Sequence, residues 1–389
     1  MSGVRKRYVG KMTVRRALDV SIGTLASLAP VLLVIGAVVL VVFFVGQRFR
    51  FFGRDISLAP TSLANVEAGV PRDVSLYTLL PKDAIRSIDD PQFVSAQEAA
   101  SAMADQEFVI GLAIEGDVRA YPINVLSRHE IVNDVVGGVP VAVTYCPLCF
   151  TGIVYDRRVD GETLEFGVSG KLVMNDLVMF DRQTDSLWQQ ILGEGIDGHY
   201  KGTRLTAVSA TQTTWARWRD AHPETLVLDK NGSYQSDSYA GYYRSGDQGV
   251  LGGFRSDDRL PAKAFVLGII VDDRPKAYPF ETLAMAPVVN DSLGDRALVV
   301  VYDDRSGTAV TFDREVDGRP LTFELERALP SDVLLRDLET GSLWSGLSGE
   351  ALDGPLAGTM LFQVPSFYSF WFAWADFYVN TDLYEDGAG

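Results

Sequence analysis

The sequence His129-Glu-Ile-Val-Asn-Asp-Val-Val-Gly-Gly-Val-Pro-Val-Ala-Val-Thr-Tyr-Cys-Pro-Leu-Cys149 holds both cysteines of the chain and one of its three histidines. Its β-branched run over 139–145 predicts a strand, and a second strand is predicted over 152–156. The Cys-Pro-Leu-Cys unit between them predicts a tight turn. Cys146 and Cys149 are therefore expected to lie on one turn at the end of a strand.

The surroundings of this stretch recur 157 residues later, and after a one-residue deletion they continue to recur at an offset of 156. The matching segments, first copy before second, are Ala120-Tyr-Pro and Ala277-Tyr-Pro, Val132-Asn-Asp and Val289-Asn-Asp, Ser186-Leu-Trp and Ser342-Leu-Trp, and Trp215 with Trp218 and Trp371 with Trp374. Because so many matches share one register, we expect two tandem repeats. The first is placed at 81–228, a linker at 229–263, and a second, degenerate repeat at 264–384.

Each repeat contains short β-rich runs separated by Asp-Gly, Gly-Gly and Gly-Thr turns. Helices are predicted after Ala-Tyr-Pro, over 123–130 in the first repeat, and at the end of each repeat, over 213–221 and 366–378. The composition, 47% hydrophobic and 22% charged, is typical of a globular protein. These features predict a β-rich α+β fold of two pseudo-symmetric halves. A single twisted sheet or barrel shared between the repeats is the alternative.

The segment Leu25–Val45 has no charged residue, and as a helix it would be about 31 Å long, enough to cross a bilayer. Basic residues precede and follow it, so the positive-inside rule places the N-terminus in the cytoplasm. We therefore expect a basic cytoplasmic segment over 1–24, a transmembrane helix over 25–45 and a linker over 46–80. The bulk of the chain, up to a short tail at 385–389, would lie outside the cell membrane. A cleaved signal peptide is disfavoured because no small-x-small site follows Val45.

The charge balance excludes one class of partner. Asp and Glu number 51 against 35 Lys and Arg, which gives a formal net charge of −16. Such a surface repels phosphate backbones, so we expect no nucleic-acid partner. The chain has no phosphate-binding loop and no dinucleotide-binding glycine pattern, so we expect no nucleotide cofactor. The membrane is the one partner that the sequence indicates, and a protein partner stays unknown.

The internal repeat separates residues that the fold needs from residues that one copy alone carries. The Trp pairs occur in both copies and are expected in the core. The residues carried by the first copy alone, each with its counterpart in the second, are His129 and Ala286, Glu130 and Pro287, Cys146 and Asp303, Cys149 and Ser306, and Lys171 and Ala328. The first copy is therefore expected to be the active one, and the second its structural partner.

The leading hypothesis is a soft-metal site formed by Cys146, Cys149 and His129. Thiolates and imidazoles are ligands of copper and zinc, and copper is preferred here because the site would lie outside the cell. Glu130, Asp134, Asn175 and His199 are weaker candidate ligands. Lys171, Asn175 and Asp176 form a polar group that would either line the same cleft or be solvated.

Two other functions remain open, and whether the protein is an enzyme is uncertain. In the first, the chain is a thiol–disulfide oxidoreductase in which Cys146 or Cys149 is the nucleophile and His129 or Glu130 assists proton transfer. The usual thioredoxin context is absent, because a strand rather than a helix follows Cys149. In the second, the cysteines form a static disulfide, and the protein is a scaffold that binds a protein or glycan between its repeats.

The motifs Ala120-Tyr-Pro, Ser127-Arg-His-Glu-Ile-Val-Asn-Asp, Thr144-Tyr-Cys-Pro-Leu-Cys and Ser186-Leu-Trp give the chain a family resemblance. It resembles the domain-of-unknown-function family 3179 over residues 82–381. The resemblance implies a prokaryotic protein that is often exported or membrane-anchored, and it implies no particular activity.

Overall fold

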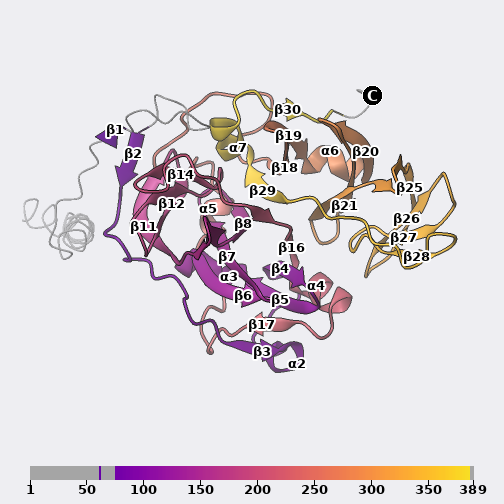
Figure 1. Ribbon diagram of the computed structural model, residues 1–389, viewed down its shortest axis with the longest axis horizontal. Helices are drawn as coiled ribbons and strands as arrows, with labels where there is room; N and C mark the ends of the chain where they lie inside the picture. The colour runs from indigo at the N-terminus through magenta and orange to yellow at the C-terminus, as the bar shows by residue number, and fades with distance from the viewer. Residues whose placement is uncertain (1–60, 63–74, 386–389) are drawn as a thin grey trace, which may run out of the picture. The chain divides into compact units, whose positions relative to one another are not determined.

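The computed structural model describes residues 61–62 and 75–385, which Figure 1 draws as coloured ribbon. The predicted cytoplasmic segment 1–24, the predicted transmembrane helix 25–45 and most of the predicted linker and tail lie outside these residues. In the described part strands dominate, and none of the six helices is longer than seven residues. No helix of this part is long and apolar enough to cross a bilayer. The described fold is β-rich, as predicted.

The first half, residues 75–228, begins with β2, which joins its main sheet. Its helices are α2 (Ala96–Ala99), α3 (Ile123–His129) and α4 (Trp215–Ala221). Its strands, together with β1 (Thr61–Ser62), which pairs with β2, are β2 (Ser75–Thr78), β3 (Phe93–Ser95), β4 (Phe108–Ile114), β5 (Asp117–Pro122), β6 (Ile131–Val136), β7 (Val139–Cys146), β8 (Thr151–Asp156), β9 (Arg158–Val159), β10 (Glu162–Thr163), β11 (Phe166–Val173), β12 (Asp176–Asp181), β13 (Leu187–Gln189), β14 (Glu194–Asp197), β15 (Ala207–Val208), β16 (Thr211–Thr214) and β17 (Leu226–Leu228).

The second half, residues 264–385, follows a connecting segment, residues 229–263, that contains α5 (Ala240–Tyr243). Its helices are α6 (Phe280–Met285) and α7 (Trp371–Phe377). Its strands are β18 (Phe265–Val271), β19 (Arg274–Pro279), β20 (Val288–Leu293), β21 (Arg296–Asp303), β22 (Thr308–Asp313), β23 (Glu315–Val316), β24 (Arg319–Pro320), β25 (Phe323–Ala328), β26 (Val333–Asp337), β27 (Leu343–Ser345), β28 (Ala351–Asp353), β29 (Ser366–Phe370) and β30 (Asp382–Leu383).

The sheets of the two halves have similar strand orders. One sheet runs β16-β4-β5-β17-β3 in the first half, and its counterpart runs β29-β18-β19-β30 in the second. The sheet that contains β11-β12-β13-β14 has the counterpart β25-β26-β27-β28, and β8-β7-β6 has the counterpart β22-β21-β20. Within the described residues no sheet contains strands of both halves, so the alternative of one shared sheet or barrel is wrong.

Polar motifs that occur in both halves make the same contacts in each. The indole Nε1 of Trp188 donates to Asp181 over 2.9 Å, and that of Trp344 donates to Asp337 over 2.9 Å. The Tyr of each Ala-Tyr-Pro donates to the Asp of the Val-Asn-Asp that follows it in the chain. Buried donors and acceptors must be paired, so these residues serve the fold rather than a ligand.

The halves contact each other reciprocally. The strand that precedes the terminal helix of the first half, β16, lies against β22, and the strand that precedes the terminal helix of the second half, β29, lies against β8. The hydroxyl of Tyr368 on β29 donates to the carbonyl of Gln212 on β16 over 2.6 Å. The largest hydrophobic cluster contains buried residues of both halves, among them Trp188 and Trp374. Each half therefore places the strand before its terminal helix against the β7–β8 type hairpin of the other half.

Three boundaries differ from the sequence predictions. Residues 213–214 and 366–370 begin the predicted terminal helices but belong to β16 and β29, because these strands pair with β4 and β18. Residues 75–78 fall in the predicted linker but form β2, which pairs with β11. The helix predicted over 123–130 is confirmed as α3, which ends at His129. The connecting segment packs on the first half through α5 and its tyrosines (Figure 1).

Candidate metal centre

The two cysteines lie on the turn between β7 and β8. Cys146 ends β7 and pairs with Thr151 of β8, and the backbone turns through Cys149 and Phe150. Both thiols are free and buried, with residue exposures of 2% and 0%. Phe150 has φ of +59°, whereas its counterpart in the second half is Gly307 with φ of +62°. The first half therefore holds a phenylalanine in a conformation that favours glycine, as strained sites often do.

Asp176 is the first residue of β12 and is fully buried. Its Oδ2 accepts hydrogen bonds from the Ile191 amide over 3.1 Å and from the Gln189 side chain. Its Oδ1 is buried without a hydrogen-bond partner in the described residues. A buried carboxylate oxygen without a partner costs free energy, which indicates a missing ligand or proton at this atom.

The side chains of Cys146, Cys149 and Asp176 come together as one group. One ligand atom of each, the two sulfurs and a carboxylate oxygen, lie within 4.8 Å of one another. Among the described residues this is the one group of three or more His, Cys, Asp or Glu side chains close enough to hold a metal ion. The main-chain carbonyl of Asn175 lies 3.6 Å from the sulfur of Cys146 and 3.5 Å from that of Cys149. This arrangement could hold a metal ion.

Burial controls the protonation of the group. It raises the pKa of the Cys146 thiol and raises that of Cys149 well above its usual value. Burial also raises the pKa of Asp176 to about 7, and burial with the charge of Asp176 raises the pKa of Glu130 to about 8. The thiols are therefore protonated at neutral pH in the metal-free protein, and a bound cation would have to displace those protons.

At the corresponding position of the second half, a basic side chain of the protein itself serves as an internal cation. Asp303 and Ser306 stand where Cys146 and Cys149 stand in the first half, and Asp332 stands where Asp176 stands. The guanidinium of Arg217, from α4 of the first half, forms a buried ion pair with Asp303, with side-chain exposures of 5% and 3%. The same guanidinium donates to the carbonyl of Pro330 over 2.7 Å and lowers the pKa of Asp332 against the larger effect of burial.

The structure does not bring His129 into the group, contrary to the predicted ligand set. Its Nδ1 lies 2.7 Å from the carbonyl of Arg86, and its Nε2 lies 2.8 Å from the hydroxyl of Tyr234. Both ring nitrogens are therefore engaged, because His129 ends α3 and turns away from the β7–β8 hairpin. Glu130 is closer to the centre, since its charge influences the Cys146 thiol.

Of the weaker candidate ligands, some lie at the centre and others lie away from it. Asp134 accepts hydrogen bonds from Arg119 and Tyr121, so its role lies in the fold. His199 is exposed on a turn and contacts Tyr200. Asn175 reaches the sulfurs through its carbonyl rather than its side chain. Of the polar group after β11, Asp176 reaches the centre, whereas the amine of Lys171 donates to Thr78 over 2.7 Å.

The connecting segment covers the centre with tyrosines, which the sequence prediction of a linker missed. The hydroxyl of Tyr242 donates to the carbonyl of Leu148, between the two cysteines, over 2.7 Å. The hydroxyls of Tyr243 and Tyr145 lie 2.9 Å apart. The run Tyr239-Ala-Gly-Tyr-Tyr was the available signal, because a flexible linker rarely carries so many aromatic residues.

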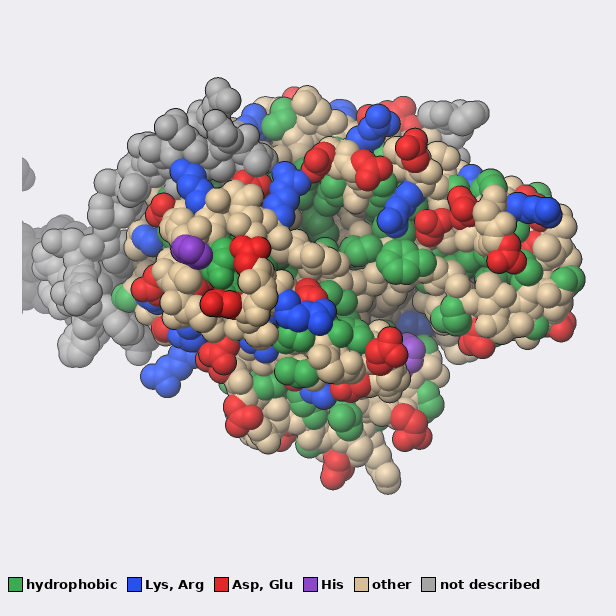
Figure 2. Space-filling view, in the orientation of Figure 1, with side chains coloured by type: hydrophobic (Ala, Val, Ile, Leu, Met, Phe, Trp, Pro, Cys, Tyr) green, Lys and Arg blue, Asp and Glu red, His purple; other side chains and the backbone are tan. Residues whose placement is uncertain are grey.

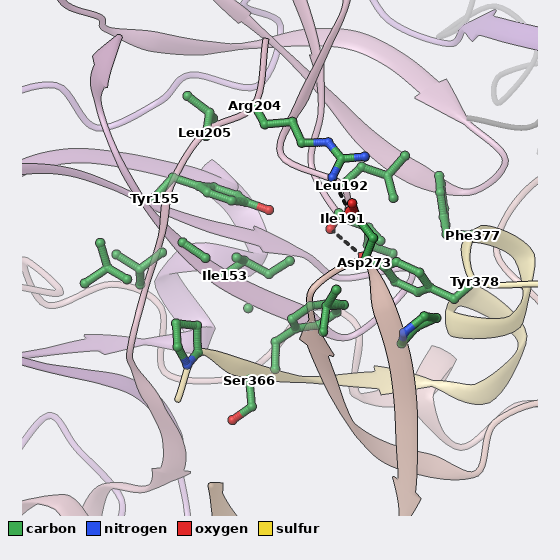
Figure 3. Close-up of a pocket in the computed structure, with 18 of the residues that line it drawn as sticks. Ile153, Tyr155, Ile191, Leu192, Arg204, Leu205, Asp273, Ser366, Phe377 and Tyr378 are labelled. Atoms are coloured by element: carbon green, nitrogen blue, oxygen red, sulfur yellow. Dashed lines mark hydrogen bonds and ion pairs between the residues drawn. The ribbon is translucent and has the colours of Figure 1, made fainter. Parts of the chain in front are cut away.

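A cavity of about 670 Å³ lies where the halves meet, lined by Tyr155 and Ile191 of the first half and by Phe367 and Tyr378 of the second. In Figure 2 this face is hollowed between the halves, and hydrophobic side chains line the hollow. Figure 3 shows Tyr155 directed toward Ile191, whose amide holds Asp176, and Arg204 facing Asp273. A second cavity of about 720 Å³ is lined by Arg217 of α4 and by His222, which follows the helix. Because the two cavities lie at corresponding places, this feature comes from the packing of the halves.

Comparison with known proteins identifies the family. The family model described as protein of unknown function (DUF3179) matches residues 82–381, and this range contains both halves and the centre. Searches of curated proteins and of solved structures find no match. The chain therefore belongs to the DUF3179 family, an uncharacterised family, as its motifs predicted.

Proposed function

We propose that the protein binds a metal ion through Cys146, Cys149 and Asp176. The single observation that carries this proposal is the buried carboxylate of Asp176, which lies within 4.8 Å of two thiol sulfurs and whose Oδ1 has no hydrogen-bond partner among the described residues. A metal ion would supply the missing partner and would stabilise the thiolates that burial otherwise disfavours.

The second half supports the proposal by contrast. There the buried acidic group meets the guanidinium of Arg217. The residue that corresponds to Arg217 on α7 is Ala373, which carries no charge. The Oδ2 of Asp176 accepts from the Gln189 side chain and the Ile191 amide, and no basic side chain of the described part is among the main causes of its pKa shift. The first half thus has a buried acidic group with no basic side chain to neutralise it. A bound metal ion would supply the missing positive charge.

The donor set favours zinc over the copper expected from sequence. Two thiolates and a carboxylate suit a borderline divalent ion, because the carboxylate is a poor ligand for the soft cuprous ion. Copper was preferred when His129 was the third ligand. We infer a divalent ion such as zinc, with copper as the other ion that the experiment must include.

The cellular setting is part of the same proposal. The apolar segment 25–45 with its flanking basic residues supports a single membrane anchor, with residues after it outside the cell. The shared element order and the recurrent motifs support an origin of the two halves by duplication. In this reading the second half lost its ligands and became the structural partner of the first.

Metal analysis of the full-length protein in detergent tests the proposal. We expect about one equivalent of zinc per chain, retained through gel filtration. A Cys146→Ser/Cys149→Ser variant and an Asp176→Asn variant should lose it. Ser306→Ala, at the position that corresponds to Cys149 in the second half, is the matched control and should keep it.

The same preparation decides among the alternatives. Thiol titration of metal-free protein would favour the oxidoreductase if it found a reversible disulfide between Cys146 and Cys149, whose sulfurs are already within 4.8 Å. A protein with neither metal nor a reversible disulfide would leave the scaffold hypothesis. Either result would overturn the metal proposal.

A further inference from the structure

We propose that the main-chain carbonyl oxygen of Asn175 is the fourth ligand of the metal, and that residues 249–252 of the connecting segment hold it in place. This proposal rests on the metal centre of the previous subsection, and it adds a ligand and a positioning device to that centre. Asn175 is therefore a ligand through its main chain and a positioning residue through its side chain.

The distances around the carbonyl fit a tetrahedral ion. In a tetrahedron with metal–sulfur bonds of about 2.3 Å and metal–oxygen bonds of about 2.1 Å, each sulfur–oxygen edge is about 3.6 Å. The Asn175 carbonyl lies 3.6 Å from the Cys146 sulfur and 3.5 Å from the Cys149 sulfur. With the carboxylate of Asp176, these atoms provide two sulfur and two oxygen donors.

The second half uses a carbonyl of the same turn for its own cation. The turn between β25 and β26 precedes Asp332, as the turn between β11 and β12 precedes Asp176. In that turn the carbonyl of Pro330 accepts a hydrogen bond from the guanidinium of Arg217 over 2.7 Å. A main-chain carbonyl before the aspartate thus faces the cation in the second half, which supports the same role in the first.

The side chain of Asn175 is clamped by the connecting segment. Its Oδ1 accepts from the amides of Val250 and Leu251 over 3.0 and 2.9 Å, and its Nδ2 donates to the carbonyl of Gly252 over 2.8 Å. Gly249 has φ of +65°, and a Cβ at this residue would stand 2.0 Å from the Asn175 Oδ1. The close approach of the segment to Asn175 therefore needs glycine.

The same segment also holds the cysteine turn. The hydroxyl of Tyr242 donates to the Leu148 carbonyl and accepts from the Gly249 amide over 2.8 Å. Residues 242–252 therefore join the turn that carries the thiols to the turn that carries the carbonyl. Because this segment holds both turns of the buried centre, we expect it to move when an ion enters or leaves. The segment should control both the affinity for the ion and its rate of release.

Cobalt(II) binding to the full-length protein tests the proposal, because cobalt reports its ligands by absorption. Asn175→Ala removes the clamp and keeps the carbonyl, and Gly249→Ala displaces the segment and keeps Asn175. We expect each to weaken cobalt binding about tenfold and to speed release to a chelator at least tenfold. Their thiolate-to-cobalt charge-transfer bands should remain, while the ligand-field bands change. Asn175→Asp, which keeps the acceptor for Val250 and Leu251, should restore part of the affinity.

Gly246→Ala is the matched control, because a Cβ there meets no atom within 4 Å. Its affinity, release rate and spectrum should equal those of the wild type. The proposal is overturned if Asn175→Ala and Gly249→Ala, both folded by circular dichroism, bind and release cobalt as the wild type does while Cys146→Ser does not bind. That result would leave the metal centre intact. A wild type that binds no cobalt or zinc would overturn the centre itself, and this proposal with it.

Discussion

Each half buries an acidic group, and the two halves differ in whether a basic side chain neutralises it. In the second half, Asp303 is neutralised by Arg217, which reaches across from the first half. In the first half, Asp176 has an unpartnered oxygen beside two thiols, and α7 offers Ala373 where α4 offers Arg217. A buried acidic group must be protonated, paired or bound to a cation. The comparison therefore supports the proposed metal site in the half whose acidic group has no internal cation.

The comparison also explains why the second half is needed. Its strand β29 packs against β8 of the β7–β8 hairpin, and the amide of Phe370 donates to the Cys149 carbonyl over 2.9 Å. Phe150, which follows Cys149, contacts Phe265 and Phe370 of the second half. The degenerate half thus forms part of the wall of the centre while contributing none of its side-chain ligands.

The largest expected effect follows from removing the guanidinium that serves as the internal cation of the second half. Arg217→Ala leaves Asp303 buried without a partner, so we expect a loss of about 3–5 kcal/mol of unfolding free energy. Denaturant unfolding at neutral pH measures it. The double variant Arg217→Ala/Asp303→Ala should recover much of the loss, because no charge then remains unpaired. A single-variant loss below about 1 kcal/mol would contradict the view that Arg217 is the internal cation.

The next largest effect is expected when a guanidinium is introduced beside the metal site of the first half. Ala373→Arg places a guanidinium on α7 at the position of Arg217, and we expect zinc affinity to fall at least about 100-fold, equivalent to about 2.7 kcal/mol. Competition with a chromogenic chelator measures the affinity. Ala373→Met adds similar bulk without charge and should retain the metal. Equal loss in both variants would show that bulk, rather than charge, removes the ion.

The reciprocal change sharpens the same comparison. Arg217→Ala/Asp303→Cys/Ser306→Cys removes the internal cation and installs two thiols beside Asp332. We expect a second equivalent of zinc per chain, measured by metal analysis after gel filtration. A folded triple variant that still binds one equivalent would show that the halves differ in more than these three residues.

A pH effect distinguishes the corresponding aspartates of the two terminal helices. Asp376 of α7 is buried, one of its oxygens has no partner, and burial raises its pKa to about 6. Asp220 of α4 pairs with Arg219 at the surface. Because the folded pKa of Asp376 exceeds the unfolded value, its ionisation should remove stability as pH rises from about 4 to 6, by about 3 kcal/mol in total.

Paired unfolding experiments check this window. Asp376→Asn should be more stable than the wild type above pH 6 and should differ little from it near pH 4. Asp220→Asn is the control and should show no such dependence. A constant difference between Asp376→Asn and the wild type from pH 4 to 7.5 would refute the pKa argument.

The smallest expected effects come from removing one tyrosine hydroxyl in each half, and the loss of stability should be equal in the two halves. Tyr121 donates to Asp134 over 2.6 Å, and Tyr278 donates to Asp291 over 2.8 Å. Tyr121→Phe and Tyr278→Phe should each cost about 1–2 kcal/mol, since each leaves a carboxylate with one fewer donor. Thermal unfolding measures the stability, and zinc content should stay unchanged. A loss of zinc in one variant alone would mean that its tyrosine serves the centre.

Local sequence signals predicted much of the fold. The run of β-branched residues and the turn signals placed β7 and β8 closely, and the shared Trp residues were placed in the core. The terminal helices were predicted too long, because Thr211–Thr214 and Ser366–Phe370 become strands by pairing with distant partners. Such pairing depends on tertiary contacts rather than on local propensity.

Within the candidate site, the sequence by itself determined the Cys-Pro-Leu-Cys turn and the fact that only one repeat carries it. Thiols three residues apart on one turn must lie close, so spacing alone placed them together. The tertiary structure alone decided which third side chain joins them. Asp176 is 27 residues beyond Cys149 in the chain, whereas His129 is nearer Cys146 but ends a helix that turns away. Proximity in space follows from how β11, β12 and the β7–β8 hairpin pack, and no local pattern in the sequence encodes it.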